Sequence, residues 1–216
     1  MNFFGHCCVA AWTHTNRAFV LGTMLPDFAT MSGGRIQGSS STDVSEGIAH
    51  HHATDSVFHS ATTFVHLCAT SSKRMDSEEV RWGTARAVAH IGVELFLDGW
   101  LLERQPENVR ASYLEALERA KPEDLGSGLH WRKDETSDRF EALRKRLLNY
   151  GLPAEIGDPE VVLSRLKGAL RGRSRLAILH EDEAAIAREL DRLVEEVRSH
   201  AATLMEEVRT GLTPSV

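Results

Sequence analysis

The sequence predicts an all-α protein, a multi-helix bundle that ends in a long C-terminal helix. Apolar residues recur every three or four positions along most of the chain, and no segment alternates apolar and polar residues for long enough to require a strand. The segment 87–101 is apolar on nearly every side, which is typical of a buried helix. A chain of 216 residues can form one domain with a sizeable core. We therefore expect a single domain over 1–216, with its core in 1–105 and a helical extension in 106–216 that packs on this core.

Capping residues and prolines set the expected helix boundaries. Asn2 and Asn16 are suitable N-caps for the first two helices, and Pro26 is expected to end the second because proline disfavours helical geometry in the preceding residue. Asp43 followed by Glu46 resembles the capping box of a third helix. The expected helices cover about 2–14, 16–27, 43–59 with a continuation to about 71, 77–103, 106–121, 135–150, 158–172 and 181–211.

Two glycine-containing segments between these helices are expected to be loops. The segment 32–41 combines glycines with a run of serines, and 123–133 contains Gly126 and Gly128. The last helix, 181–211, repeats its apolar residues among many Glu and Arg, which is the pattern of an amphipathic surface or partner helix. It is compatible with a homodimer contact and equally with packing on its own domain.

Charge, hydropathy and cysteine usage exclude several classes of protein. The formal net charge of −6 argues against a nucleic-acid-binding protein. The chain has no long apolar run and no secretory leader, so we expect a cytoplasmic protein without a membrane partner. Cys7, Cys8 and Cys68 lack C-x-x-C spacing and are expected to be small buried hydrophobes.

Two ladders of potential metal ligands lie in the first half of the chain. Each has three members at four-residue steps: His51, Asp55 and His59 in the first, and His90, Glu94 and Asp98 in the second. Residues four apart lie on one face of a helix, so neighbouring members can share a cation. Carboxylates buried in an apolar helix are costly unless they are paired or bind a metal. The spacing therefore predicts a metal site between two helices. The alternative is a set of buried salt bridges to arginines such as Arg81 or Arg86.

Four short motifs occur in an order that resembles the acyl-carrier-protein phosphodiesterase family. They are M-N-F-x-x-H at 1–6, L-G-x-x-L-x-D-F at 21–28, G-I-x-x-H-x-x-x-D at 47–55 and acid-x-x-x-Asp-x-x-L at 94–101. The resemblance covers roughly the first 105 residues and implies an HD-domain-like, all-α metal phosphohydrolase. The metal ligands that it implies are His6, Asp27, His51, Asp55, Glu94 and Asp98.

The chain departs from the family pattern at four positions near these ligands. It has His52 where the family usually has Arg, and His59 where the family has Asp. It has Glu94 where Asp is common and Gly99 where His is common. A metal site is still expected with these four residues. They put in question whether the chain shares the family's substrate.

The ligand types predict the metal and the reaction. Histidine nitrogen with carboxylate oxygen suits Mn²⁺, Fe²⁺ or Zn²⁺. We expect one or two ions, manganese or iron in preference to zinc. Two metal ions about 3.5–4 Å apart can stabilise an in-line phosphoryl displacement. The sequence therefore predicts phosphoester hydrolysis, and the resemblance implies removal of 4′-phosphopantetheine from an acyl carrier protein, with a small phosphoester as the other candidate substrate.

Several side chains are candidates for roles in catalysis. Asp55 is a central, bridging ligand in this hypothesis, and Glu94 or Asp98 binds or orients the water. His59 and His90 are candidate ligands, general acids or phosphate donors, and these alternatives stay open.

Substrate binding is assigned to His52 and to a basic run. Arg171, Arg173 and Arg175 form either a solvated helix face or an anion dock that would attract an acidic carrier protein.

The competing functional class is a non-hydrolytic, HD-like metal protein. It would be either an iron oxygenase or a metal-stabilised scaffold for protein interaction. Redox-active iron would favour the oxygenase, and a fully saturated ligand shell would favour the scaffold.

Overall fold

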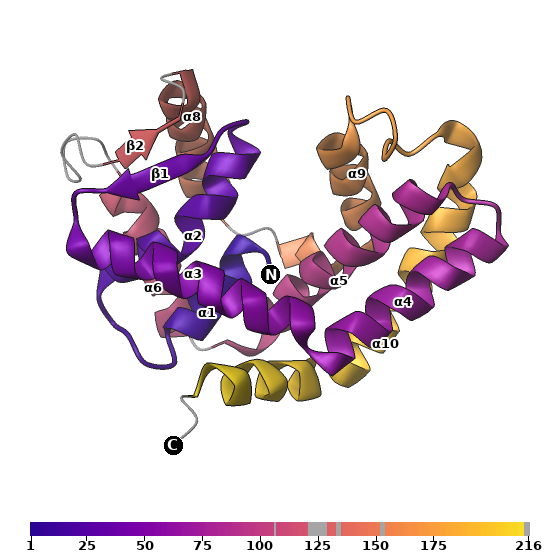
Figure 1. The fold of residues 1–216 in the computed structure, drawn as a ribbon, viewed down its shortest axis with the longest axis horizontal. Helices are drawn as coiled ribbons and strands as arrows, with labels where there is room; N and C mark the ends of the chain where they lie inside the picture. Colours follow the sequence, from indigo (N-terminus) through magenta and orange to yellow (C-terminus); the bar gives the residue numbers. More distant parts are fainter. Residues whose placement is uncertain (106, 121–128, 133–134, 152–153, 214–216) are drawn as a thin grey trace. The chain divides into compact units, whose positions relative to one another are not determined.

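The computed structural model describes residues 1–105, 107–120, 129–132, 135–151 and 154–213 (Figure 1). Its elements, in chain order, are α1 (Phe3–Ala10), α2 (Arg17–Met31), β1 (Ile36–Ser39), α3 (Thr42–Ser60), α4 (Thr62–Ser77), α5 (Trp82–Arg104), α6 (Glu107–Arg119), β2 (Leu129–Trp131), α8 (Glu135–Tyr150), the 3-10 helix η2 (Ala154–Gly157), α9 (Pro159–Leu170), the 3-10 helix η3 (His180–Asp182) and α10 (Glu183–Leu212). The predicted all-α class and long C-terminal helix are confirmed. The expected ends of the 106–121 helix and most of the 123–133 loop lie outside the described residues.

The chain divides into two compact units. Unit 1 contains Met1–Ser56 and Arg104–Pro153, and unit 2 contains Val57–Glu103 and Ala154–Val216. Each unit therefore combines a segment from the first 105 residues with one from the remainder. The single domain expected over 1–216 stays a prediction.

Unit 1 has an aromatic core around its first two helices. α1 packs against α2 and α6, and α2 also packs against α6 and α8. The ring centroid of Phe3 lies 5.2 Å from that of Phe28 and 6.0 Å from that of Tyr113, and all three side chains are buried. An aromatic side chain buries about 150–250 Å². This cluster therefore holds the short helix α1, which carries His6, against α2.

A pair of glycines allows α2 and α3 to approach closely. A Cβ atom on Gly22 would lie 2.9 Å from the Cα of Gly47, and one on Gly47 would lie 2.8 Å from the Cα of Gly22. Real side chains do not tolerate such distances, so only glycine permits this backbone contact. The contact lies four to five residues from Asp27 and His51 in the sequence, and it sets the spacing of the helices that carry them.

The N-termini of α2 and α3 are joined by side-chain hydrogen bonds. Asn16 caps α2 as predicted, because its side-chain oxygen accepts a hydrogen bond from Ala18 N at 2.9 Å. Its amide nitrogen donates to Asp43 at 2.8 Å. The cap of α3 is Ser41 instead of Asp43, since the Ser41 hydroxyl accepts from Val44 N at 3.4 Å.

The prediction that Pro26 ends the second helix is wrong, because α2 continues to Met31. A proline inside a helix removes a hydrogen bond and costs about 3 kcal/mol. The turn after it buries Phe28 and Ala29 completely or nearly so. Burying a Phe side chain stabilises by about 1.5–3 kcal/mol, which offsets most of that cost.

The predicted loop 32–41 contains a strand. β1 pairs with β2 in an antiparallel two-stranded sheet, with Ile36 opposite Trp131 and Ser39 opposite Leu129 (Figure 1). The partners are 90 to 95 residues apart in the sequence. A short strand with so distant a partner leaves no local pattern, which explains why the periodicity did not predict it.

Unit 2 is organised around α10, which lies beside α4 and also packs against α9 (Figure 1). The buried face of α10 contains the apolar positions that define its amphipathic pattern: Ile186, Leu190, Leu193, Val194 and Val197. Arg74 of α4 ties the two helices together. Its guanidinium donates to Glu189 at 2.6 and 2.8 Å and to Glu196 at 2.9 Å. The amphipathic helix therefore packs within its own unit.

The break between α4 and α5 comes later than expected. α4 runs to Ser77, and α5 begins at Trp82 instead of Ser77. Glu79 has a φ of 65°, a left-handed conformation that continues no helix. This residue therefore ends α4.

Two smaller expectations concern the cysteines and the membrane. Cys7 and Cys8 are buried as predicted, whereas Cys68 is half-buried. Among the described residues, no helix has the length and apolar character needed to cross a membrane.

Candidate metal centres

The first candidate centre lies in unit 1, where α1, α2 and α3 each contribute a side chain. The ligand atoms of His6, Asp27 and His51 all lie within 4.8 Å of one another. His6 and His51 are buried, and Asp27 is half-buried. Asp55, one helical turn after His51, joins them: its Oδ1 lies 3.1 Å from His6 Nε2 and its Oδ2 lies 3.5 Å from His51 Nε2. The structure thus brings His6, Asp27 and His51 together as one group of potential ligands, and Asp55 contacts both histidines of this group.

The backbone of α2 sets the orientation of the His51 ring. Its Nδ1 lies 2.8 Å from the carbonyl oxygen of Thr23. A carbonyl oxygen only accepts, so Nδ1 carries the hydrogen and the neutral ring presents a lone pair at Nε2. That lone pair lies 3.5 Å from the Asp55 carboxylate, and two acceptors at this distance repel unless a cation lies between them. Metal-binding histidines usually donate a hydrogen bond from their other ring nitrogen to an acceptor in this way.

The surroundings of His51 keep it neutral. Burial, followed by the charge of His6, lowers the pKa of His51 to about 3, although Asp55 and the Thr23 carbonyl act in the opposite direction. The ring of His6 stacks on that of His51 with centroids 3.9 Å apart. A neutral imidazole is the form that binds a metal. His51 therefore needs no deprotonation to act as a ligand at neutral pH.

Asp55 is ionised in the same surroundings. Burial alone would raise the pKa of Asp55, but its contact with His6 and the charge of the Met1 amino group outweigh burial and lower this pKa. The Met1 amino group donates to Asp55 Oδ1 at 2.8 Å. The Asp55 side chain is 29% exposed, so its negative charge is accessible from solvent.

A cavity of about 330 Å³ opens at this centre. Its lining residues come from α2, α3, β1 and the segment before β1: Pro26, Asp27, Thr30, Arg35, Ile36, His51, His52 and Asp55. Arg35 and His52, which are both exposed, belong to this lining. The carboxylates and His51 are therefore accompanied by groups that can bind an anion.

The second candidate centre lies in unit 2 and contains His59, His90 and Glu94. Glu94 Oε1 lies 3.1 Å from His59 Nε2 and 3.2 Å from His90 Nε2. The two imidazole rings stack with centroids 4.9 Å apart. Burial alone would raise the pKa of Glu94, but the hydrogen bonds from His59 and His90 lower it. One ionised carboxylate therefore holds two imidazoles.

Asp98 completes the second predicted ladder and is fully buried on α5. It belongs to neither of the two groups of potential ligands found among the described residues. His6, Asp27, His51 and Asp55 lie in unit 1, whereas Glu94 and Asp98 lie in unit 2. A joint centre of all six residues stays a prediction.

The two arginines named for the salt-bridge alternative have partners other than Glu94 and Asp98, among them the buried Asp182, whose Oδ2 lies 4.0 Å from Arg81 Nε. The guanidinium of Arg81 donates to the carbonyl oxygens of Ser174 and Ala177. The guanidinium of Arg86 lies over the Trp82 ring, 4.6 Å from its centroid.

The basic run lies in unit 2, after α9. Arg171, Arg173 and Arg175 are exposed. The residues that line the cavity of about 330 Å³ all belong to unit 1. The role of these three arginines as an anion dock stays a prediction.

Three contributors to the first centre were not foreseen from the sequence: the Met1 amino group, Thr23 and Arg35. Thr23 acts through its backbone carbonyl, and any residue type provides that group. Arg35 follows two glycines in a segment expected to be a loop, and a lone arginine there gives no sign of where it lies. Only the position of Thr23 inside the L-G-x-x-L-x-D-F motif could have drawn attention to it.

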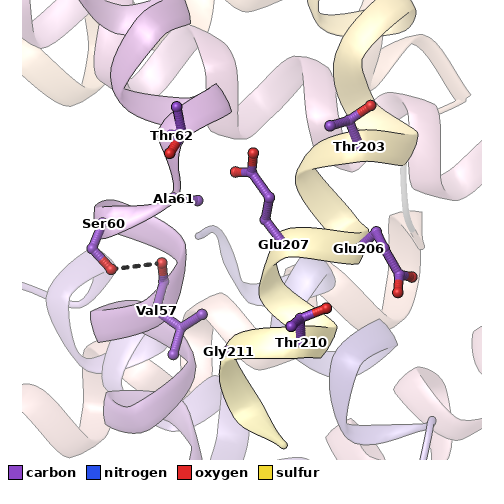
Figure 2. Close-up of a pocket in the computed structure, with 9 residues that line it drawn as sticks. All are labelled: Val57, Ser60, Ala61, Thr62, Thr203, Glu206, Glu207, Thr210 and Gly211. Atoms are coloured by element: carbon purple, nitrogen blue, oxygen red, sulfur yellow. Dashed lines mark hydrogen bonds between the residues drawn. The ribbon is translucent and has the colours of Figure 1, made fainter.

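A further groove of about 500 Å³ lies in unit 2, between α10 and the junction of α3 and α4 (Figure 2). It is lined by Val57, Ser60, Ala61, Thr62, Thr203, Glu206, Glu207, Thr210 and Gly211. None of these lining residues is a cation or a histidine, so the groove favours neither phosphate nor a transition metal.

Comparison of the chain with protein-family models, with curated proteins and with solved structures finds no match in any of the three.

Proposed function

We propose that the protein is a metal-dependent phosphoester hydrolase whose reaction takes place at the unit 1 centre. The observation that carries the proposal is the orientation of His51. The Thr23 carbonyl fixes Nδ1 as the protonated nitrogen and leaves the Nε2 lone pair beside the Asp55 carboxylate. This arrangement is favourable when a cation binds between them.

The donor set fits a divalent transition metal. His6, His51, Asp27 and Asp55 supply imidazole nitrogen and carboxylate oxygen, which suit Mn²⁺, Fe²⁺ or Zn²⁺. Ligand atoms of a tetrahedral site with bonds near 2.0–2.1 Å are about 3.3 Å apart. Asp55 Oδ1 lies 3.1 Å from His6 Nε2, and the other oxygen, Oδ2, lies 3.5 Å from His51 Nε2, so each oxygen is close to this spacing from one imidazole. We expect manganese or iron in preference to zinc.

The cavity wall supplies the groups that bind phosphate. The guanidinium of Arg35 can donate two parallel hydrogen bonds to phosphate oxygens. His52 lies next to the ligand His51 in the sequence and lines the same cavity. A bound divalent ion supplies positive charge for the phosphoryl group and lowers the pKa of water.

The proposed reaction is hydrolysis with a simple balance of bonds. The oxygen of water forms a bond to phosphorus while the bond between phosphorus and the leaving oxygen breaks. Asp55 accepts a hydrogen bond from the water and orients it. The proton that the water loses is matched by one that the leaving oxygen gains, and His52 is the imidazole at the cavity wall that can donate it.

The substrate we favour is a phosphodiester carried by a larger molecule, such as the 4′-phosphopantetheine arm of an acyl carrier protein. Support for the carrier comes from the order of the motifs in the first 105 residues. A cavity of about 330 Å³ admits a phosphate with a short part of an attached arm, and it admits a small phosphoester equally well.

Hydrolysis is tested with protein purified without chelator and supplied with Mn²⁺ or Fe²⁺. We expect it to hydrolyse an aryl phosphodiester, an aryl phosphomonoester or holo-acyl carrier protein. We expect His51→Gln to retain its helical circular dichroism but to lose the metal bound at the unit 1 centre, and to lower kcat/KM by about 100-fold or more.

The matched control is His66→Gln, which changes an exposed histidine on α4. It should keep both metal content and activity. A metal-loaded protein that releases no product from any of the three substrates would contradict the proposed reaction.

A further inference from the structure

Unit 2 contains a group of side chains that the proposed reaction does not use. His59, at the end of α3, and His90, on α5, both direct Nε2 at the same carboxylate oxygen of Glu94. From these contacts we infer that His59, His90 and Glu94 form a second, independent metal site, which takes a divalent transition metal such as Zn²⁺ through two imidazoles and one carboxylate.

The separations of the ligand atoms fit such an ion. Glu94 Oε1 lies 3.1 and 3.2 Å from the two Nε2 atoms, and all three ligand atoms lie within 4.8 Å of one another. A tetrahedral zinc site with bonds near 2.0–2.1 Å places its ligand atoms about 3.3 Å apart. Both distances from Glu94 Oε1 are therefore within a few tenths of an ångström of this value, and metal binding also requires the hydrogen to leave each Nε2, for instance by tautomerisation to Nδ1.

The rings are held in place before any ion binds. Phe64 of α4 contacts both imidazoles edge to face, with centroids 5.2 Å from His59 and 5.1 Å from His90. Phe58 packs against Phe64 at 4.5 Å and is itself fully buried. Ligands whose orientation is fixed by packing lose little conformational entropy on binding.

Charge and access also favour a cation. The Glu94 side chain is 15% exposed, so its negative charge is poorly solvated and gains from a positive partner. The His90 side chain is 45% exposed, which gives solvent and ions a route to the group. Two imidazoles with one carboxylate are a donor set for zinc or iron that leaves room for a water ligand.

The two centres are separated experimentally by metal stoichiometry. Chelator-stripped protein is dialysed against Zn²⁺, and bound zinc is counted by elemental analysis. We expect two equivalents in the wild type, one in His90→Gln and one in His51→Gln, and none in the double variant. Glu94→Gln should lower the affinity of the second site by about 10–100-fold, because it keeps the shape of Glu94 and removes its charge.

A second readout uses Co²⁺ in the His51→Gln background, where only the unit 2 site remains. Its visible absorption should appear there and vanish when His90→Gln or His59→Gln is added. Zn²⁺ should raise the thermal midpoint of His51→Gln but not that of the double variant.

Two results would overturn the inference. One is that His90→Gln binds as many equivalents of zinc as the wild type, with the same affinities. The other is complete loss of metal from His51→Gln, which would mean a single centre. Failure of the hydrolase proposal looks different, because an inactive protein that loses one equivalent only with His90→Gln would still possess the second site.

Discussion

The histidines of the two centres are prepared for metals in different ways. His51 donates a hydrogen bond from Nδ1 to a backbone carbonyl, so its Nε2 lone pair is available to a metal. His59 and His90 instead direct Nε2 at a carboxylate, so a proton now lies where an ion would bind. Metal binding at the second centre therefore requires the hydrogen to leave each Nε2, for instance by tautomerisation to Nδ1, whereas His51 already presents its Nε2 lone pair.

The protonation of His51 predicts the acid sensitivity of the chelator-treated protein. The pKa of His51 falls from an ordinary 6.5 to about 3 on folding. Between these values the unfolded chain binds a proton that the folded chain does not, so stability is lost as pH falls through this window. We expect the free energy of unfolding, measured by urea denaturation at successive pH values, to decrease less steeply with falling pH for His51→Gln than for the wild type. His66→Gln should keep the wild-type slope, and equal slopes in all three proteins would contradict the prediction.

At the scale of elements, the contact between α2 and α3 depends on glycine. We expect Gly47→Ala to destabilise the protein by about 1–3 kcal/mol, because a Cβ there must push the two backbones apart. The separation of Asp27 from His51 should change with it, and metal affinity at the unit 1 centre should fall. Urea denaturation and zinc titration measure the two effects.

Gly168→Ala is the matched control for this substitution. Gly168 lies inside α9, and a Cβ there meets nothing within 4 Å. It should stabilise the helix by about 0.5–1 kcal/mol, since alanine is the better helix former. A Gly47→Ala protein as stable as wild type would mean that the close approach is not required.

The start of α4 depends on a glutamate from α10. Ala61, the N-cap residue, makes no side-chain hydrogen bond, whereas Glu207 accepts from Thr63 N at 3.0 Å and from its hydroxyl at 2.9 Å. Figure 2 shows Glu207 reaching from α10 toward the first turn of α4. Glu207→Ala should cost about 0.5–2 kcal/mol of unfolding free energy, as the loss of a helix cap does.

Glu206→Ala provides the comparison. Glu206 is 70% exposed and faces Arg209 at 3.8 Å on the surface of the same helix. A surface pair of this kind contributes about 0–1 kcal/mol. Chemical denaturation should therefore separate the two variants, and equal effects would show that Glu207 does not act as a cap.

The helices were predictable because their signals are local. The segment 135–150 matches α8 at both ends, and Asp158 caps α9 through two backbone nitrogens, at 2.9 and 3.1 Å. Features that depend on distant residues were not predictable in the same way. Pro26 stays helical because the turn after it is buried, and β1 forms because β2 lies beside it.

The first centre was predictable to a similar extent. Four-residue spacing placed His51 and Asp55 on one face, and the resemblance added His6 and Asp27. The third member of the ladder, His59, belongs to the other group of potential ligands. Each four-residue step turns about 40° around the helix, and the unit boundary at Ser56 falls before His59. His59 therefore contacts Glu94 and His90 in unit 2.

At the scale of the whole molecule, bound metal should contribute measurably to stability. When the free metal concentration is 100 times the dissociation constant of one site, binding adds about 2.7 kcal/mol to the free energy of unfolding. Calorimetry should show a lower thermal midpoint in chelator than in Zn²⁺ for the wild type. The midpoint of the His51→Gln/His90→Gln double variant should not respond, and His66→Gln should respond as the wild type does. Equal thermal midpoints of the wild type in chelator and in Zn²⁺ would argue against both centres.

The discontinuous units also have a consequence for synthesis on the ribosome. α5 is completed at Arg104, but α10, whose leucines pack against Gly92 of α5, ends at Leu212. Translation of the intervening residues takes roughly 5–20 s at about 5–20 residues per second. Throughout that interval the nascent chain exposes the apolar faces of α4 and α5 without the helix that covers them. These faces are then natural targets for a chaperone, and slow translation between α5 and α10 should increase aggregation instead of improving folding.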